Sequence, residues 1–209
     1  MSDGKVRDPV FSREREWVSA SPGIDQEKIQ RAVVMILEAV GENPDREGLR
    51  DTPARVARMY AEVFRGLHQN AADVLATRFH VDHNDVVLVK EIPFYSMCEH
   101  HLLPFFGHAH VAYVPSRGVV TGLSKLARLV EAFARRPQVQ ERMTNQIADT
   151  LHNALTPEGT LVLVEAEHLC MSMRGIQKPG TRTLTLATRG SLEANRVLRE
   201  EVIKMVREG

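Results

Sequence analysis

The sequence is poor in cysteine and in aromatic residues, and it has no excess of either charge. Its 209 residues include two cysteines and one tryptophan, and aromatic residues make up 5%. Two cysteines are too few for the disulfide framework of a small secreted domain. The 27 basic and 27 acidic residues give a formal net charge of +0, so no overall field attracts nucleic acid or an anionic membrane. We expect neither as a partner.

Long apolar runs are also missing. No run approaches the ~20 residues that a membrane-spanning helix needs. Residues 1–21 contain no apolar segment of the kind found in secretory signals. The hydrophobic fraction of 43% is ordinary for a globular protein of this length. We therefore expect a cytoplasmic protein.

Composition and periodicity divide the chain into four parts. We expect a flexible tail, a helical region, a catalytic domain and a C-terminal helix, at residues 1–22, 23–80, 81–190 and 191–209. In the helical region, Asp25 is expected to cap a helix that Gly41 ends, and Thr52-Pro53 to begin another. The apolar residues expected on the buried faces are Ile29, Ala32, Val33, Ile36, Leu37 and Val40, then Val56, Met59, Tyr60, Val63 and Phe64.

The catalytic domain is predicted to have the element order β-β-α-α-β-β. Strands are expected at residues 86–92, 110–114, 160–167 and 181–188, and helices at 124–134, 139–155 and, beyond the domain, 192–207. Ser124 and Ser191 are the expected caps. Short links favour an α+β architecture, an antiparallel four-stranded sheet with two helices on one face. A small sheet has exposed edges, which favour pairing with other subunits.

Both cysteines have histidine neighbours. Cys98 and His101 have the Cys-x-x-His spacing of a zinc pair and are expected on a long loop between the first two strands. Residues i and i+2 of a strand face the same side, so His168 and Cys170 could both point into one site. Two thiolates and one imidazole would leave a coordination position for water, as in a catalytic zinc site. A Cys98–Cys170 disulfide and a buried pair of free cysteines are the alternatives.

Three imidazoles accompany the predicted metal, although only one is needed as a ligand. His100 and His168 are therefore candidate proton carriers, because imidazole titrates near neutral pH. His108 and His110 alternate on the next strand, and we interpret one or both as packing residues.

A group of basic residues predicts an anion site. Ser124 begins a helix whose free N–H groups and dipole suit phosphate, and Lys125 and Arg128 share one face of that helix. Arg174 follows the second cysteine closely, and Arg55 could add a bidentate clamp. A solvated helix face is the alternative.

Glu141 lies near the start of the helix that follows Pro137. A carboxylate there can simply favour the helix dipole. It can also accept two N–H bonds from a guanine edge. Both interpretations remain open at this point.

Several of these segments resemble the GTP cyclohydrolase I family. The matching segments are residues 43–49, 51–57, 98–101, 122–128, 136–142 and 168–175, and the resemblance runs from about residue 25 to about residue 190. The sequence departs from the commoner family pattern at His108, where Lys is frequent, and at Leu186, where a small hydroxyl residue is frequent.

The resemblance implies a tunnelling fold, in which four-stranded sheets join into an oligomeric barrel, and a homodecamer of two pentamers with sites at subunit interfaces. It implies that GTP and water become 7,8-dihydroneopterin triphosphate and formate, the first step of tetrahydrofolate and pterin synthesis. The implied Zn²⁺ ligands are Cys98, His101 and Cys170, and the implied catalytic residues are His100, His168 and Ser124. The implied substrate contacts are Glu141, Gln140, Arg55, Lys125, Arg128 and Arg174.

Two other functions are compatible with parts of this pattern. A non-catalytic zinc module needs a fourth protein ligand, and no third cysteine exists to supply it. A nitrile reductase of queuosine synthesis would use a nucleophilic cysteine and NADPH, which the paired cysteines with Cys-x-x-His spacing disfavour.

Overall fold

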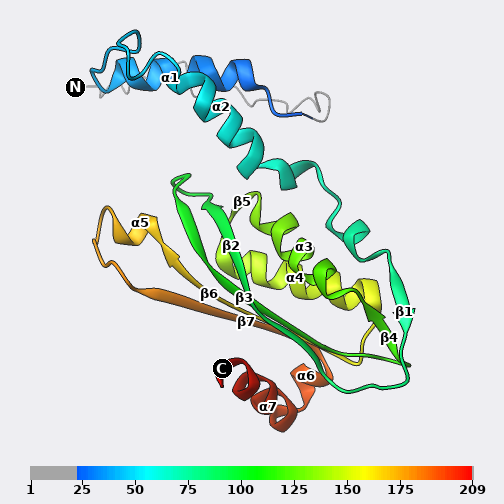
Figure 1. The fold of residues 1–209 in the computed structure, drawn as a ribbon. Coiled ribbons are helices and arrows are strands. Elements are labelled where there is room, and N and C mark those ends of the chain that lie inside the picture. Colours follow the sequence, from blue (N-terminus) through cyan, green and yellow to red (C-terminus); the bar gives the residue numbers. More distant parts are fainter. Residues whose placement is uncertain (1–22, 209) are drawn as a thin grey trace, which may run out of the picture.

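A twisted, mainly antiparallel sheet forms the centre of the molecule (Figure 1). The computed structural model describes residues 23–208, so the expected flexible tail lies outside the described residues. The strand order is β5-β2-β3-β6-β7, with bounds β2 (Val87–Cys98), β3 (Pro104–Val114), β5 (Pro137–Gln138), β6 (Gly159–His168) and β7 (Arg182–Gly190). The four long strands pair antiparallel, as predicted, while the unpredicted β5 pairs parallel with the end of β2.

The first two strands are longer than expected, so the predicted long loop between them is wrong. β2 continues past Ile92 to Cys98, and only a short turn separates it from β3. Pro93 disfavours a strand interior, but β2 pairs only with β3 at that point within the described chain, and a strand edge tolerates proline. Cys98 is therefore held by the sheet itself.

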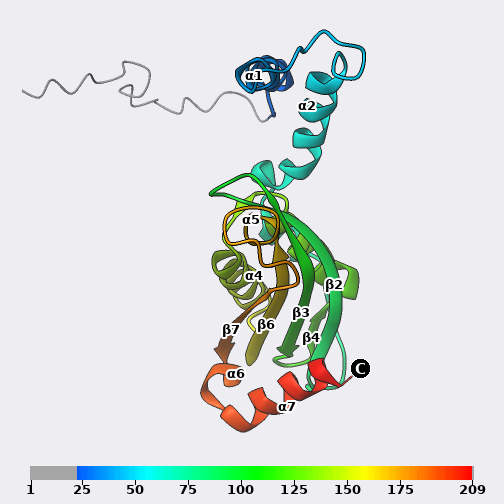
Figure 2. The ribbon, with the colours of Figure 1, turned by 90° about the vertical axis from the view of Figure 1, so that its left-hand side faces the viewer.

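Two helices cover one face of the sheet, as predicted (Figures 1 and 2). They are α3 (Leu123–Ala134) and α4 (Gln140–Leu155). Their apolar faces pack on inward-facing strand residues to form the main core, in which the fully buried members include Leu126, Leu129, Met143, Ile147, Leu151, Phe105 and Val111. A separate two-stranded ribbon pairs β1 (Arg78–His80) with β4 (Val119–Thr121). The first strand belongs to the expected helical region and the second to the expected catalytic domain, so these two parts pair across the boundary expected at residue 81.

The helical region before the sheet contains α1 (Gln26–Ala39), α2 (Thr52–Val63), and the short 3₁₀ helices η1 (Arg65–His68) and η2 (Ala71–Leu75). The Asp25 cap is confirmed, since its carboxylate accepts a bond of 2.9 Å from the Lys28 N–H. Gly41 follows α1 with φ of 84°, a conformation that glycine adopts without strain. The predicted Thr52 cap is wrong by one residue, because Asp51 occupies the N-cap position and Thr52 is already helical.

Two other predicted caps are also wrong. Gly122 is the N-cap of α3, and Ser124 lies within the helix. The single C-terminal helix is two helices, α6 (Ser191–Ala194) and α7 (Arg196–Arg207), separated by Asn195. The side chain of Asn195 caps α7, whereas the buried Ser191 hydroxyl has no hydrogen-bond partner among the described residues. Asn and Ser are comparable N-cap residues, and the Asn195 side chain accepts the bond from the Leu198 N–H that begins α7.

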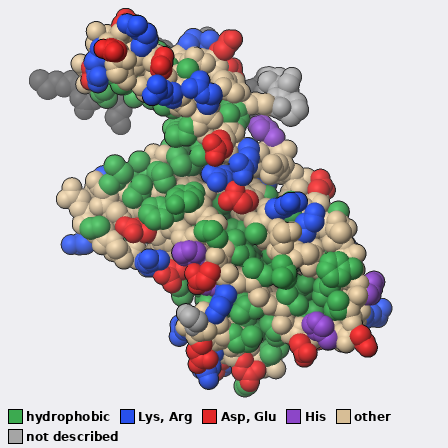
Figure 3. Space-filling model, viewed as in Figure 1, with side chains coloured by type: hydrophobic (Ala, Val, Ile, Leu, Met, Phe, Trp, Pro, Cys, Tyr) green, Lys and Arg blue, Asp and Glu red, His purple; other side chains and the backbone are tan. Residues whose placement is uncertain are grey.

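The apolar faces predicted to be buried on α1 and α2 are at most half-buried, and none of the residues named for them is fully buried. These helices contact each other and extend away from the sheet (Figure 2). No residue of α1 is buried, and Val40 and Met59 are 72% and 44% exposed. Hydrophobic side chains also gather in patches on the face shown in Figure 3. Exposed apolar area of this kind marks association surfaces.

No helix within residues 23–208 combines the length and apolarity that a membrane span requires.

His110 is a packing histidine, as predicted for one or both members of the pair His108 and His110. It is 5% exposed, and its Nδ1 accepts a 3.3 Å bond from the Glu91 N–H. Glu91 lies at a bulge in β2 with φ of 58°, and its carboxylate is within 3.8 Å of the ring nitrogens of both His108 and His110. Burial is the largest influence on His110 and lowers its pKa, while Glu91 acts in the opposite direction.

This burial predicts a loss of stability in acid. As pH falls below the ordinary histidine value of ~6.5, the unfolded chain binds the proton more readily than folded His110 does. Stability is thus fully present above that value and falls as pH approaches the lowered pKa of the folded state. His110→Gln should show a smaller drop in melting temperature than wild type between pH of about 7.5 and about 5.5. The exposed His80→Gln should behave like wild type, and an equal acid loss in His110→Gln would refute the assignment.

Candidate metal centre and substrate pocket

The turn that ends β2 brings two predicted metal ligands together. The Leu102 N–H donates to the Cys98 carbonyl at 2.8 Å, and the Cys98 N–H donates to the Leu103 carbonyl at 2.8 Å. Leu102 adopts a positive φ of 52° to close this turn. The chain therefore folds back tightly, which puts His101 beside Cys98, as the Cys-x-x-His spacing predicted.

The third predicted ligand arrives from another part of the sheet. β3 pairs with β6 so that Phe105 is opposite His168, and this register places the end of β6 next to the turn. The physical reason given for Cys170 is wrong, because Cys170 lies on the short helix α5 (Leu169–Ser172) and not on a strand. The chain turns into α5 directly after His168, and this turn carries Cys170 toward Cys98.

The donor atoms of Cys98, His101 and Cys170 all lie within 4.8 Å of one another. Both cysteines are free thiols, so the alternative disulfide is not formed. Burial, followed by the neighbouring Cys98 thiol, raises the pKa of Cys170. Two thiol sulfurs and one imidazole nitrogen fit zinc, whose borderline-soft character suits mixed sulfur and nitrogen ligands.

Arg174 is the one predicted phosphate contact that reaches this centre within a single chain. Its Nη1 lies 2.7 Å from His101 Nε2. A guanidinium group can only donate, so this ring nitrogen is the acceptor and carries no proton. A metal ion at the same nitrogen would require Arg174 to turn away, toward the open side of the site.

A pocket of about 220 Å³ lies beside the metal ligands. Its lining brings together predicted residues of three kinds: metal ligands, proton carriers and guanine contacts. They are Cys98, Cys170, His100, His168, Gln140 and Glu141. Two imidazoles and an exposed carboxylate next to a zinc-type donor set can support acid–base chemistry on a planar heterocycle.

His168 is held on two sides. Its ring stacks on Phe105 with centroids 4.6 Å apart and planes 2° from parallel. Burial, its largest influence, lowers the pKa of His168, while the Glu141 carboxylate raises it. The stacking fixes the plane of the His168 ring, because Phe105 is itself fully buried in the core.

The side chain of Gln140 sets the tautomer of His168. Gln140 Nε2 lies 3.1 Å from the Val164 carbonyl and 3.0 Å from the Thr183 carbonyl, and both can only accept. The amide must therefore present its oxygen to His168, and Gln140 Oε1 lies 2.7 Å from His168 Nε2. Neutral His168 consequently carries its proton on Nε2, leaving the Nδ1 lone pair free.

Four predicted residues lie elsewhere in the chain. Ser124 and Lys125 are in the first turn of α3, a helix of 12 residues and therefore ~18 Å long. The opposite end of α3 leads into β5, which pairs with Cys98. Arg128 lines a different pocket, and Arg55 on α2 pairs with the neighbouring Asp51 at 3.4 Å. One chain alone therefore does not bring these residues to the metal centre.

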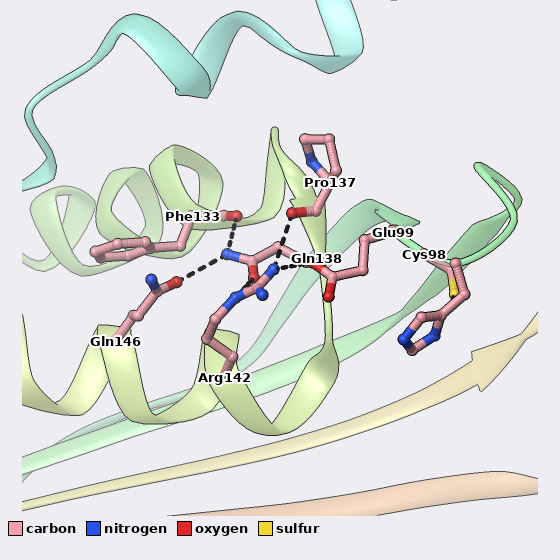
Figure 4. A network of polar contacts seen from close by, with 8 residues as sticks. Cys98, Glu99, Phe133, Pro137, Gln138, Arg142 and Gln146 are labelled. Atoms are coloured by element: carbon pink, nitrogen blue, oxygen red, sulfur yellow. Dashed lines mark hydrogen bonds and ion pairs between the residues drawn. The ribbon is translucent and has the colours of Figure 1, made fainter. Parts of the chain in front are cut away.

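Sequence reasoning missed the residues that anchor the turn between β2 and β3, residues 99–103, which we call the metal turn because it carries His101. Glu99, Gln138 and Arg142 form a network of hydrogen bonds and an ion pair between this turn and α4 (Figure 4). All three occur within segments that carried the family resemblance, at residues 98–101 and 136–142, but none was given a role. Gln138 lies on β5 and Glu99 on the turn after β2, so no helical spacing pointed to their contacts with Arg142.

The fold and the site together define an α+β protein with a thiol–imidazole group that could hold a metal ion, beside a pocket containing histidines. The sequence pattern of GTP cyclohydrolase I matches residues 29–207, and this chain belongs to that family of enzymes. GTP cyclohydrolase 1 of Halalkalibacterium halodurans is 61% identical over 184 residues, covering 88% of this chain and 98% of the relative. The same-named protein of Lysinibacillus sphaericus is 60% identical over 183 residues, covering 88% and 97%.

Among solved structures, the apo form of the archaeosine synthase QueF-Like is similar to part of this chain. It is 19% identical, with a TM-score of 0.42, and the match covers 52% of this chain and 97% of that chain.

Replacing Gln140 tests the orientation of His168. Gln140→Leu removes the acceptor that fixes the His168 tautomer, and we expect turnover of GTP to fall by ~10²-fold, within the range of a misplaced acid–base group. Thr144→Val is the matched control, because the buried Thr144 hydroxyl contacts the Gln140 carbonyl and Thr185 but not His168. Both variants should lower the melting temperature, while only Gln140→Leu should lose most of its kcat. Equal kcat in the two would contradict the role of Gln140.

Proposed function

We propose that this protein is a zinc-dependent GTP cyclohydrolase that converts GTP and water to 7,8-dihydroneopterin triphosphate and formate, the first step of tetrahydrofolate and pterin synthesis. The observation that carries the proposal is the juxtaposition of the Cys98, His101 and Cys170 donors with His100 and His168 in one pocket. Membership of the family supports the same reaction. GTP is a cytoplasmic nucleotide, so we expect the protein in the cytoplasm.

The chain supplies proton carriers for opening the imidazole ring of guanine. A zinc ion held by Cys98, His101 and Cys170 would supply Lewis-acid activation of water. His168 has a free Nδ1, and its orientation is fixed by Gln140, so it can hold or deliver a proton at one defined position. His100 lies on the same pocket wall, and either histidine is a candidate for protonating N7.

Guanine recognition is assigned to Glu141. Its carboxylate lines the pocket, is exposed, and has the geometry to accept two N–H bonds from the guanine edge. The amide of Gln140 is already engaged by His168 and two backbone carbonyls. We therefore propose that Gln140 serves the substrate site by positioning His168.

The phosphate contacts require more than one copy of the chain. Arg174 is beside the metal ligands, whereas Ser124, Lys125, Arg128 and Arg55 are remote from them within one chain. The sheet offers two means of assembly: β7 has no strand partner on its outer side among the described residues, and Leu184 and Leu186 on it are 53% and 44% exposed. Exposed edges and apolar area both favour association. We propose a homo-oligomer with a shared barrel, in the family a decamer of two pentamers, in which neighbouring copies complete each site.

The zinc proposal predicts the behaviour of Cys170→Ala. Wild-type protein incubated with GTP should produce formate and a fluorescent pterin, and a strong chelator should stop both. Cys170→Ala should contain less than about a tenth of the wild-type zinc and should show no turnover, because two remaining ligands bind zinc weakly. Metal content is measured by elemental analysis and pterin by fluorescence. Full turnover by metal-free Cys170→Ala would eliminate the zinc proposal.

The shared site predicts recovery of activity when two inactive variants assemble together. His168→Ala and Lys125→Ala should each be inactive alone while retaining zinc. If His168 and Lys125 of one site come from different copies, random co-assembly leaves about a quarter of the sites intact. Differently tagged chains are co-expressed, isolated through both tags and assayed for formate release. No recovery in a doubly tagged oligomer would show that the copies do not share sites.

A further inference from the structure

The turn that carries Cys98 and His101 is fastened to helix α4 by one ion pair. Arg142 Nη2 donates to Glu99 Oε2, and the same nitrogen lies 3.1 Å from the Pro137 carbonyl (Figure 4). Glu99 sits between the two metal ligands Cys98 and His101 on the turn. The two side chains are 33% and 44% exposed, so the pair is partly shielded from water. A change in the position of Arg142 would therefore also move Glu99 and the metal turn.

Gln138 holds Arg142 in place from the buried side. Its Oε1 accepts a 3.1 Å bond from Arg142 Nε, and its Nε2 donates to the Phe133 carbonyl at 3.0 Å and to Gln146 Oε1 at 2.9 Å. Gln138 is only 2% exposed, so these bonds are not exchanged for bonds to water. Its backbone carbonyl also accepts a 3.0 Å bond from the Glu99 N–H. Gln138 thus supports the metal turn in two ways. Its side chain holds Arg142, and its backbone carbonyl accepts the bond from Glu99.

The metal site depends on how this turn is tilted. Cys98 ends β2 and His101 lies on the turn that follows it, whereas Cys170 lies on α5, which follows a different strand. A small rotation of this turn moves the His101 ring relative to both cysteine sulfurs. Zinc tolerates little departure from its preferred ligand distances of ~2.0–2.3 Å. An outer anchor is therefore needed where the turn carries one ligand, His101, and directly follows another, Cys98.

We propose that Arg142, fixed by Gln138, positions the Cys98–His101 turn for metal binding through its ion pair with Glu99. Because Gln140 orients His168 from the same first turns of α4, this helix end aligns the metal ligands and the proton carrier with each other. Arg142, Gln138 and Glu99 are positioning residues and do not touch the substrate. The inference rests on the proposed zinc site.

The test measures zinc affinity of purified full-length protein, by competition with a chromophoric chelator. Arg142→Gln should bind zinc ~10–100-fold more weakly than wild type, the usual effect of removing a partner behind the metal ligands. Glu99→Gln removes the same ion pair from the other side and should give a similar loss, so the test survives if one variant folds poorly. With Co²⁺ in place of zinc, both variants should show a broadened and shifted visible spectrum, because the ligand geometry is no longer fixed.

Asp149→Asn is the matched control. It breaks the 2.7 Å ion pair between Asp149 and Arg189 of β7, and Asp149 lies within α4 about two turns after Arg142. It should leave zinc affinity and the Co²⁺ spectrum unchanged. Wild-type zinc affinity in both Arg142→Gln and Glu99→Gln would overturn the positioning role while leaving the zinc proposal intact. A wild-type protein that bound no zinc would overturn both.

Discussion

The register between β3 and β6 is the constraint on which the site depends. It sets Phe105 opposite His168, so the stacked ring of His168 lies at the mouth of the pocket and Cys170 follows beside the metal turn. Strand side chains alternate between faces, so a slip of one residue would move His168 to the other side of the sheet. Metal ligand, proton carrier and core packing would all be lost together. The apolar core under the sheet therefore also enforces the chemistry, because it permits only this register.

Helix α4 applies a second constraint at the same place. Its buried face packs through Met143, Ile147 and Leu151, which fixes where its first turn can lie. That turn holds His168 through Gln140 and the metal turn through Arg142. The position of the site is thus set by the register between β3 and β6 and by the first turn of α4. Of the four basic residues predicted to contact phosphate, only Arg174 contacts this site within one chain.

Local chemistry was well predicted where it depended on short spacing. The Cys-x-x-His turn, the helix pair and the four long strands all follow from periodicity and ligand spacing. Errors arose where a tertiary contact overrides a local signal. The first strand was expected to end at Ile92, whereas β2 continues through Pro93 to Cys98, and Cys170 was placed on a strand that in fact ends at His168. Family resemblance, more than periodicity, supplied the remaining site residues.

The sequence by itself predicted the group of Cys98, His101 and Cys170, because two cysteines with adjacent histidines leave few other roles for these residues, and the structure brings their donor atoms together. Only the tertiary structure decided what supports them. Gln138, Arg142 and Glu99 are ordinary polar residues in the sequence, and their contacts run between an extended strand, a turn and a helix. Such contacts depend on the packing angle between elements, which no local pattern encodes. The same packing keeps Lys125, in the first turn of α3, away from Cys98, which lies near the other end of that helix.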